Sequence, residues 1–144
     1  MKNKDGKQLL EVLQYEEIGY SPILHHRDFR IAILNYHPEL LVENISNFQQ
    51  HSRTDEAFVL LQGECTLFLA EDERIETVHG IKMEPLKLYN VKQGTYHTHT
   101  LSEDAKVLIV EADDTCDDNS PMIFVDEVIR KHIREAYKKA SPSP

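Results

Sequence analysis

The sequence contains little cysteine, glycine or proline, and no long hydrophobic run. Its two cysteines, Cys65 and Cys116, are far apart and form no C-x-x-C pair, which excludes a disulfide scaffold and is typical of a reduced, cytosolic protein. Five glycines and six prolines in 144 residues exclude collagen-like and low-complexity chains. No apolar run approaches the ~18 residues of a membrane span. Residues 1–14 lack the apolar core of a secretion signal.

Basic side chains are also scarce, with 16 Lys and Arg against 25 Asp and Glu, giving a formal net charge of −9. A surface of that sign repels phosphate backbones and anionic lipids, so we expect neither nucleic acid nor membrane as a partner. The length predicts a single domain over residues 1–144. A chain of this size buries enough surface to fold without a disulfide or a metal.

From about residue 24 to 112 the chain is a series of short β-type runs separated by turn residues. The expected strands are 29–36, 45–51, 58–61, 66–69, 75–78, 86–91, 96–101 and 107–111. Helices do not alternate with these runs, which disfavours a parallel α/β sheet. The spacing predicts an all-β fold, either a sandwich or a closed antiparallel barrel.

Two of these runs, 58–61 and 107–110, are apolar on both faces, so a second element must cover one face of each. One candidate is a C-terminal helix within about residues 121–140, predicted from apolar residues at helical spacing and capped at Ser120–Pro121 or at Asp126. The other candidates are a second sheet and a second subunit, and we expect a homodimer.

A short amphipathic helix is also expected in the first 20 residues, where Leu9, Leu10, Val12 and Leu13 are closely spaced.

Among the eight histidines, five are expected to be structural or exposed: His25, His26, His37, His79 and His132. The other three are more informative. His97 and His99 are two residues apart on an expected strand, so both imidazoles face the same side. His51 precedes Glu56 near another expected strand. If these strands cross inside a barrel, two or three imidazoles and one carboxylate meet, which is a ligand set suited to Zn, Fe, Mn or Ni.

The order and spacing of these residues resemble the two motifs of the cupin superfamily. The first motif reads H-x-H, three or four residues, E, six residues, G, and His51, Glu56 and Gly63 match it. The second reads P-x-G-x-x-H-x-x-x-N, and Gly94 and His97 match it. The resemblance covers about residues 24–112. It implies an antiparallel jelly-roll β-barrel, and the expected C-terminal α-helix would then pack outside it.

The resemblance also implies a metal site with His51, Glu56 and His97 as ligands. Gln49 stands where the family has its first histidine, Lys92 replaces the proline of the second motif, and Leu101 replaces the asparagine. His99 has no counterpart among the usual ligands. Either His99 or Gln49 would complete the ligand set, and His99 and Glu56 are the candidate acid–base residues. A metal-free pocket remains the alternative, because the family includes members without metal.

Family membership would imply a small-molecule ligand. One hypothesis is a metal-dependent enzyme on a small polar metabolite, of isomerase, epimerase or dioxygenase type. The other is a metal-free module that binds or senses a sugar-like molecule without catalysis. The candidate pocket-lining aromatics are Tyr36, Phe58, Phe68, Tyr89 and Tyr96. Near the motifs, only Arg53 and Lys92 could bind a phosphate group.

Overall fold

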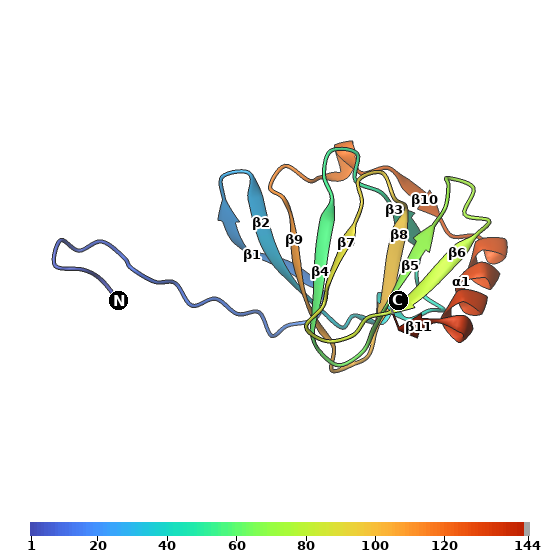
Figure 1. Cartoon of the computed structure of the whole chain (residues 1–144), viewed down its shortest axis with the longest axis horizontal. Coiled ribbons are helices and arrows are strands. Elements are labelled where there is room, and N and C mark those ends of the chain that lie inside the picture. The colour runs from blue at the N-terminus through green and yellow to red at the C-terminus, as the bar shows by residue number, and fades with distance from the viewer. Residues whose placement is uncertain (143–144) are drawn as a thin grey trace.

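The computed structural model describes residues 1–142, which form two facing β-sheets, one helix outside them and an extended N-terminal segment (Figure 1). The five-stranded sheet has the order β1 (Tyr20–His26), β2 (Phe29–Asn35), β9 (Lys106–Ala112), β4 (Glu56–Gln62) and β7 (Leu88–Val91). The six-stranded sheet has the order β10 (Met122–Phe124), β3 (Asn47–Gln49), β8 (His97–Leu101), β5 (Cys65–Ala70), β6 (Val78–Lys82) and β11 (Ser141–Pro142).

The predicted all-β class and the C-terminal helix are confirmed, since the two sheets form an antiparallel barrel and α1 spans Glu127–Lys139. Among the described strands, only the pair β6–β11 is parallel. Gln49 of β3 pairs with His97 of β8, so the two motif segments are neighbours as predicted. Several boundaries differ: β3 is shorter than the expected 45–51, and β1 and β10 were not expected.

The barrel interior is apolar at one end. Inward-facing residues of both sheets form one cluster: Ala32, Leu34, Phe58, Leu60, Cys65, Leu67, Met83, Val91, Leu101, Ala105, Val107 and Ile109. The alternation of β4 explains this packing, because Phe58 and Leu60 point inward while Val59 and Leu61 point outward. Burial raises the pKa of the Cys65 thiol to about 12, so this cysteine is an inert core residue.

Helix α1 covers the outer face of the six-stranded sheet. Its N-cap is Asp126, whose carboxylate accepts a 2.8 Å hydrogen bond from the backbone N–H of Ile129. Ile129, Ile133 and Ala136 pack in a second cluster, together with Ile45, Phe48, Phe68, Ala70 and Ile75. The alternative start at Ser120–Pro121 is wrong, because 122–124 form β10 and pair with the edge strand β3.

The helix therefore does not cover the strands for which a cover was expected. It packs against β5 and β6, whereas β4 and β9 belong to the opposite sheet. Val59, Leu108 and Val110 remain partly exposed on the outer face of the five-stranded sheet, and Leu61 is exposed there.

The helix expected in the first 20 residues is wrong. Residues 1–14 form an extended arm that projects away from the barrel (Figure 1). Residues 2 and 8 form an isolated antiparallel bridge at its tip, with a turn at Gly6. No helix within residues 1–142 has the length and apolarity needed to cross a membrane.

Candidate metal centre

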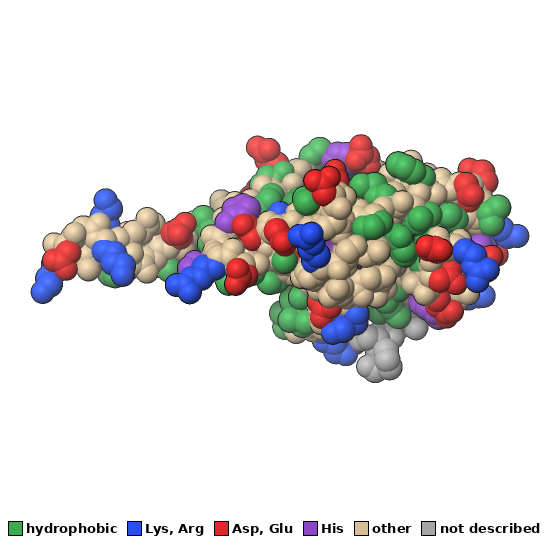
Figure 2. All heavy atoms as spheres, turned by 90° about the horizontal axis from the view of Figure 1, so that it is seen from above, with side chains coloured by type: hydrophobic (Ala, Val, Ile, Leu, Met, Phe, Trp, Pro, Cys, Tyr) green, Lys and Arg blue, Asp and Glu red, His purple; other side chains and the backbone are tan. Residues whose placement is uncertain are grey.

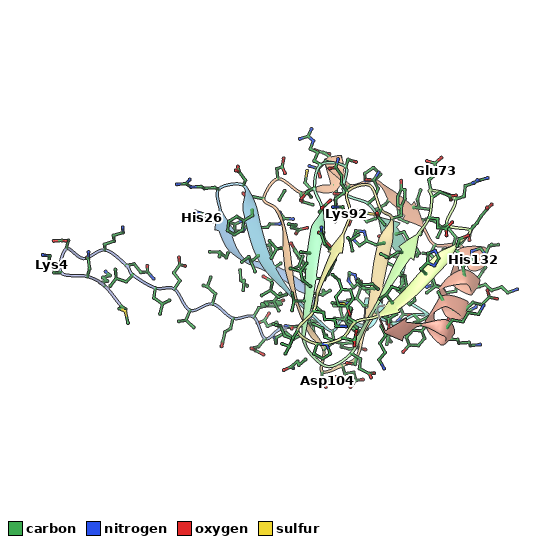
Figure 3. The ribbon with its side chains drawn as sticks, viewed as in Figure 1. Lys4, His26, Glu73, Lys92, Asp104 and His132 are labelled. Carbon is green, nitrogen blue, oxygen red and sulfur yellow. The ribbon has the colours of Figure 1, made fainter. Side chains whose placement is uncertain are left out.

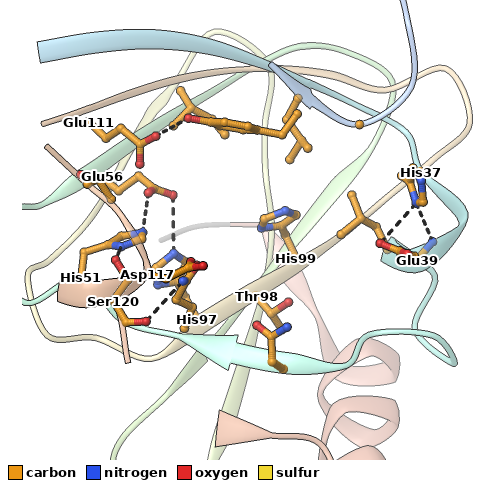
Figure 4. A pocket seen from close by; sticks show the side chains of 18 of the residues that line it. His37, Glu39, His51, Glu56, His97, Thr98, His99, Glu111, Asp117 and Ser120 are labelled. Carbon is orange, nitrogen blue, oxygen red and sulfur yellow. Dashed lines mark hydrogen bonds and ion pairs between the residues drawn. The ribbon is translucent and has the colours of Figure 1, made fainter. Parts of the chain in front are cut away.

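A cavity of about 520 Å³ opens between the two sheets. It is lined from both sides: Glu56 and Glu111 come from the five-stranded sheet, whereas His97, Thr98 and His99 come from β8 (Figure 4). The short helices η1 (Pro38–Leu40) and η2 (Asp117–Asn119) contribute to its rim. Its volume is in the range of small-molecule pockets.

Three sequence-predicted ligands meet in this cavity. His51 lies two residues after β3, Glu56 is the first residue of β4, and His97 is the first residue of β8. Their ligand atoms all lie within 4.8 Å of one another, and all three residues are buried. Two imidazoles and one carboxylate form a donor set of the kind that holds a divalent transition metal.

Hydrogen bonds on the far sides of both imidazoles fix their orientation. His51 Nδ1 lies 2.8 Å from Ser120 Oγ, and His97 Nδ1 lies 2.9 Å from the carbonyl oxygen of Thr95. A second partner of this kind is the usual support for a metal-binding histidine. As a result, the Nε2 atoms of both rings point to the Glu56 carboxylate.

The tautomer of His97 follows from its partner. A carbonyl oxygen only accepts hydrogen bonds, so Nδ1 of His97 must carry a hydrogen, and Nε2 of the neutral ring then carries a lone pair. Nε2 lies 3.5 Å from Oε1 of Glu56, which is also electron-rich. Two electron-rich atoms repel each other unless a cation, either a proton on Nε2 or a metal ion, lies between them. The residues present therefore fit a bound cation.

His51 and Glu56 are strongly coupled through the 2.6 Å contact between Nε2 and Oε2. Burial disfavours the charged imidazole of His51, but the hydrogen bond and negative charge of Glu56 raise its pKa above the usual value. Burial also disfavours the Glu56 carboxylate, yet hydrogen bonds from His51 and His97 hold its pKa well below the usual value. Glu56 thus stays ionised and attracts positive charge to this point.

The two candidates for a fourth ligand, His99 and Gln49, line the same cavity but are placed differently. His99 faces the cavity, as its spacing from His97 predicted, but it is not in the close group of ligand atoms (Figure 4). Its Nδ1 is buried without a hydrogen-bond partner, and burial, followed by the charge of His97, lowers its pKa to about 4. The amide nitrogen of Gln49 donates to the carbonyl oxygen of Ser120 at 3.3 Å.

The cavity holds a second carboxyl group that the sequence patterns did not predict. Glu111 of β9 is buried next to Glu56, and it accepts hydrogen bonds from Tyr20 Oη and, at 3.0 Å, from Arg30 Nε (Figure 4). Burial, followed by hydrogen bonding to Glu56 and repulsion from its charge, raises the pKa of Glu111 to about 7. The alternation of β9 could have indicated this position. Val107, Ile109 and Glu111 lie on one face of the strand, and because Val107 and Ile109 point into the barrel, Glu111 must point inward as well.

The expected aromatic lining is wrong, because none of the five proposed aromatics lines this cavity. Phe58 and Phe68 lie in the two apolar clusters, and the aromatic ring in the cavity is that of Tyr20. The two candidate phosphate-binding residues also lie outside the cavity. Lys92 pairs with Asp55 at 2.8 Å, and Arg53 lies 3.8 Å from Asp114.

His26 and His132, two of the histidines expected to be structural or exposed, lie at opposite sides of the molecule (Figure 3).

No protein-family model matches this chain, and no curated protein matches it in sequence. Solved structures match its fold. A cupin-2 domain protein from Shewanella frigidimarina superposes with a TM-score of 0.50 at 17% identity, over 68% of this chain and 84% of the other. Streptomyces Pac13, described as a nucleoside dehydratase, superposes with a TM-score of 0.53 at 9% identity, over 80% and 88%.

This chain has the cupin fold. The protein NMB1881 from Neisseria meningitidis is similar as well, with a TM-score of 0.50 at 11% identity, over 69% of this chain and 89% of the other. At these identities the likeness concerns the fold. The cupin barrel therefore accounts for how β3, β4 and β8 bring His51, Glu56 and His97 together.

Proposed function

We propose that this protein is a single-domain cupin metalloprotein that binds a divalent transition metal (Zn, Fe, Mn or Ni) through His51, Glu56 and His97. It acts on a small polar metabolite in the adjoining cavity. The observation that carries this proposal is the convergence of the ligand atoms of His51, Glu56 and His97 within 4.8 Å of one another, in a buried group whose two imidazoles are oriented through Nδ1.

A divalent ion at this position supplies a Lewis acid that polarises a substrate oxygen. Two further groups of the chain, His99 and Glu111, line the same cavity. His99 is neutral at physiological pH because its pKa lies near 4. Its Nδ1 is buried, so Nε2 is the ring nitrogen left to bond a substrate hydroxyl, as donor or acceptor according to the tautomer. Glu111, with a pKa of about 7, can accept or release a proton near neutral pH. Such a site suits isomerase, epimerase or dioxygenase chemistry.

The cavity favours a neutral, hydroxyl-rich substrate over a phosphorylated one. Arg30 is the only lysine or arginine in the described lining, and the Glu111 carboxylate already pairs with it at 2.9 Å. The lining also includes uncharged hydrogen-bonding side chains, among them Asn47, Gln49 and Thr98, and two further carboxylates, Glu39 and Asp117, which would repel a phosphate group. A sugar-like molecule matches this lining. Pac13, which has the same fold, has been solved with uridine, another hydroxyl-rich metabolite.

The alternative function is a metal-free cupin that binds or senses a sugar-like molecule without catalysis. Two observations favour it: Gln49 stands where the cupin motif has its first histidine, and Glu56 already contacts both His51 and His97.

Both functions are proposed for a cytoplasmic protein, since Cys65 and Cys116 are free thiols.

Metal content of the untagged protein distinguishes the two. We expect near-stoichiometric transition metal by elemental analysis, and its loss in both His51→Ala and His97→Ala. The matched control is His79→Ala, because His79 is exposed and pairs with Glu71 on the surface. Full metal content in His97→Ala would place the ion elsewhere. No metal in the wild-type protein after incubation with all four ions would favour the binding module.

A further inference from the structure

Two loops lead to the ligands of the proposed metal site, and both lie at the upper end of the barrel in Figure 1. The first loop, residues 51–55, ends at Glu56, where β4 begins. The second loop, residues 92–95, ends two residues before His97, where β8 begins. A shift of one loop against the other would change the distance between the Glu56 carboxylate and the His97 imidazole. The contacts between the two loops therefore help to set the geometry of the site.

Asp55, the last residue of the first loop, makes three of these contacts. Its Oδ1 accepts a 2.7 Å hydrogen bond from the backbone N–H of Gln93. Its Oδ2 accepts hydrogen bonds from Asn90 Nδ2 at 3.0 Å and from Lys92 Nζ at 2.8 Å. Hydrogen bonds from Lys92, Gln93 and Asn90 hold the pKa of Asp55 at about 2, so the carboxylate is ionised at physiological pH and its bonds are charge-assisted.

The backbone of the first loop holds the second loop as well. The backbone N–H of Gly94 donates to the carbonyl oxygen of His51 at 2.9 Å. Gln93 Nε2 donates to the carbonyl oxygen of Ser52 at 2.7 Å. Gln93 is thus bonded to the first loop through its side chain and, at Asp55, through its backbone. The two loops form one hydrogen-bonded unit.

The second loop is a tight turn that positions the partner of His97. The backbone N–H of Thr95 donates to the carbonyl oxygen of Lys92 at 3.0 Å, and Gly94 has a φ of +80°, as the third position of a type II turn requires. The carbonyl oxygen of Thr95 in turn accepts the hydrogen bond from His97 Nδ1 at 2.9 Å. Movement of this turn would therefore rotate the imidazole and displace its Nε2.

Lys92 stands where the second cupin motif has a proline. A proline ring restricts the backbone at that position, whereas here the Lys92 side chain, labelled in Figure 3, bonds to Asp55. Figure 2 views the molecule from this end and shows basic and acidic side chains intermixed, as such pairs require. The exposed fraction is 73% for the Lys92 side chain and 36% for that of Asp55. Exposed ion pairs contribute little, so we expect the backbone N–H of Gln93 to be the more important partner.

We propose that Asp55 is a positioning residue: its carboxylate holds the second loop against the first and so keeps the His97 imidazole in place beside Glu56. Asp55 is not among the described residues that line the cavity, so it acts through the turn and Thr95. This proposal rests on the proposed function, because it assigns to Asp55 a share of the metal affinity.

Isothermal titration of chelator-treated protein with Zn²⁺ is the first test. Asp55→Ala removes all three acceptor contacts and should weaken binding by about tenfold, the lower end of the usual effect when the support of a metal ligand is lost. Asp55→Asn keeps an oxygen for the Gln93 N–H and should recover part of the loss, and Lys92→Ala should cost less than Asp55→Ala. Glu43→Ala is the matched control, because its carboxylate pairs with Arg134 of α1 at 2.8 and 2.6 Å.

Bound Co²⁺ distinguishes positioning from a general loss of stability, because its visible absorption depends on the arrangement of the ligand atoms. We expect Asp55→Ala to change this spectrum and Glu43→Ala to leave it unchanged. Urea unfolding of the metal-free proteins measures the stability of each variant. If Asp55→Ala is less stable but keeps the wild-type Zn²⁺ affinity and Co²⁺ spectrum, Asp55 supports only the fold and the proposal is overturned.

A measurement without metal separates this proposal from the proposed function. In metal-free protein labelled with ¹⁵N-histidine, the exchange of the His97 Nδ1 hydrogen with water reports its bond to Thr95. We expect exchange to be roughly tenfold faster in Asp55→Ala than in the wild type, and unchanged in Glu43→Ala. If the wild type binds no metal but shows this difference, the proposed function fails while Asp55 still positions His97. Equal exchange rates in the wild type and Asp55→Ala would overturn the proposal whatever the metal content.

Discussion

Ser120 Oγ lies 2.8 Å from Nδ1 of His51, although 69 residues separate the two in the sequence. Ser120 precedes β10, which pairs with β3, so this pairing brings the serine behind the imidazole. The contact turns Nε2 of His51 toward Glu56. A residue outside both motifs therefore orients a motif histidine.

Ser120→Ala should weaken metal binding by about 10–100-fold, the usual effect of removing the partner of a metal-binding histidine. The imidazole loses its fixed orientation, while the fold is retained. Isothermal titration with Zn²⁺ measures the affinity. Ser52→Ala is the control, because Ser52 is exposed and its hydroxyl donates only to Gln50. Equal affinity in both variants would argue against an orienting role for Ser120.

Metal affinity should fall as the pH is lowered from 8 to 5.5, with the decline starting above pH 6.5. A proton competes with the metal for Nε2 of His51, and the neighbouring Glu56 raises the pKa of that imidazole above its usual value. Zn²⁺ titrations at half-unit pH steps measure this. A decline confined to pH values below 6 would contradict the coupling between His51 and Glu56.

The free energy of unfolding should carry a contribution from Glu111 that decreases between about pH 4.5 and 7. The pKa of this carboxyl is raised from 4.5 to about 7 in the folded protein, so the folded state binds the proton more tightly than the unfolded chain. The stabilising contribution is therefore complete below pH 4.5 and is lost as the pH rises through 7. Glu111→Gln should remove this dependence.

Urea unfolding of chelator-treated protein at several pH values measures the effect, with Glu103→Gln in an exposed turn as the control. An unchanged pH profile in Glu111→Gln would mean that Glu111 does not hold a shifted proton.

Ile133→Ala should destabilise the fold by about 2–5 kcal/mol, because Ile133 is completely buried between α1 and the six-stranded sheet. Val128→Ala on the same helix is 63% exposed in the wild type and should change the free energy of unfolding by less than about 0.5 kcal/mol. Thermal unfolding of both variants gives the comparison. Similar losses in both would mean that α1 packs on a different face.

The fold and the core of the site could be predicted from the sequence because both depend on local signals. Strand alternation and turn residues predict the barrel, and the resemblance of the segments around His51, Glu56 and His97 to the cupin motifs implies that these residues converge. The position of Glu111 depends on register across two strands, so an inward carboxylate in an apolar strand did not by itself identify a partner for Glu56. Periodicity also cannot tell which sheet a helix covers, which is why α1 was a candidate cover for β4 and β9.

The arm shows another limit of local patterns. Leu9, Leu10, Val12 and Leu13 fit one helical face, but hydrogen bonds from the Asn3 side chain favour a turn instead. Short helices are marginal in water without tertiary packing, and the arm has no packing against its own barrel.

His97 begins β8 and His51 follows β3, both on the side of the six-stranded sheet, whereas Glu56 begins β4 of the five-stranded sheet. The site therefore bridges the barrel at the end opposite its apolar core, and a cation bound to all three residues would have to be released before the sheets could separate there. The free energy of unfolding would then depend on the concentration of free metal in solution as well as on the sequence. A metal at 100 times its dissociation constant adds about 2.7 kcal/mol, so metal-poor conditions would loosen the pocket end of the barrel first.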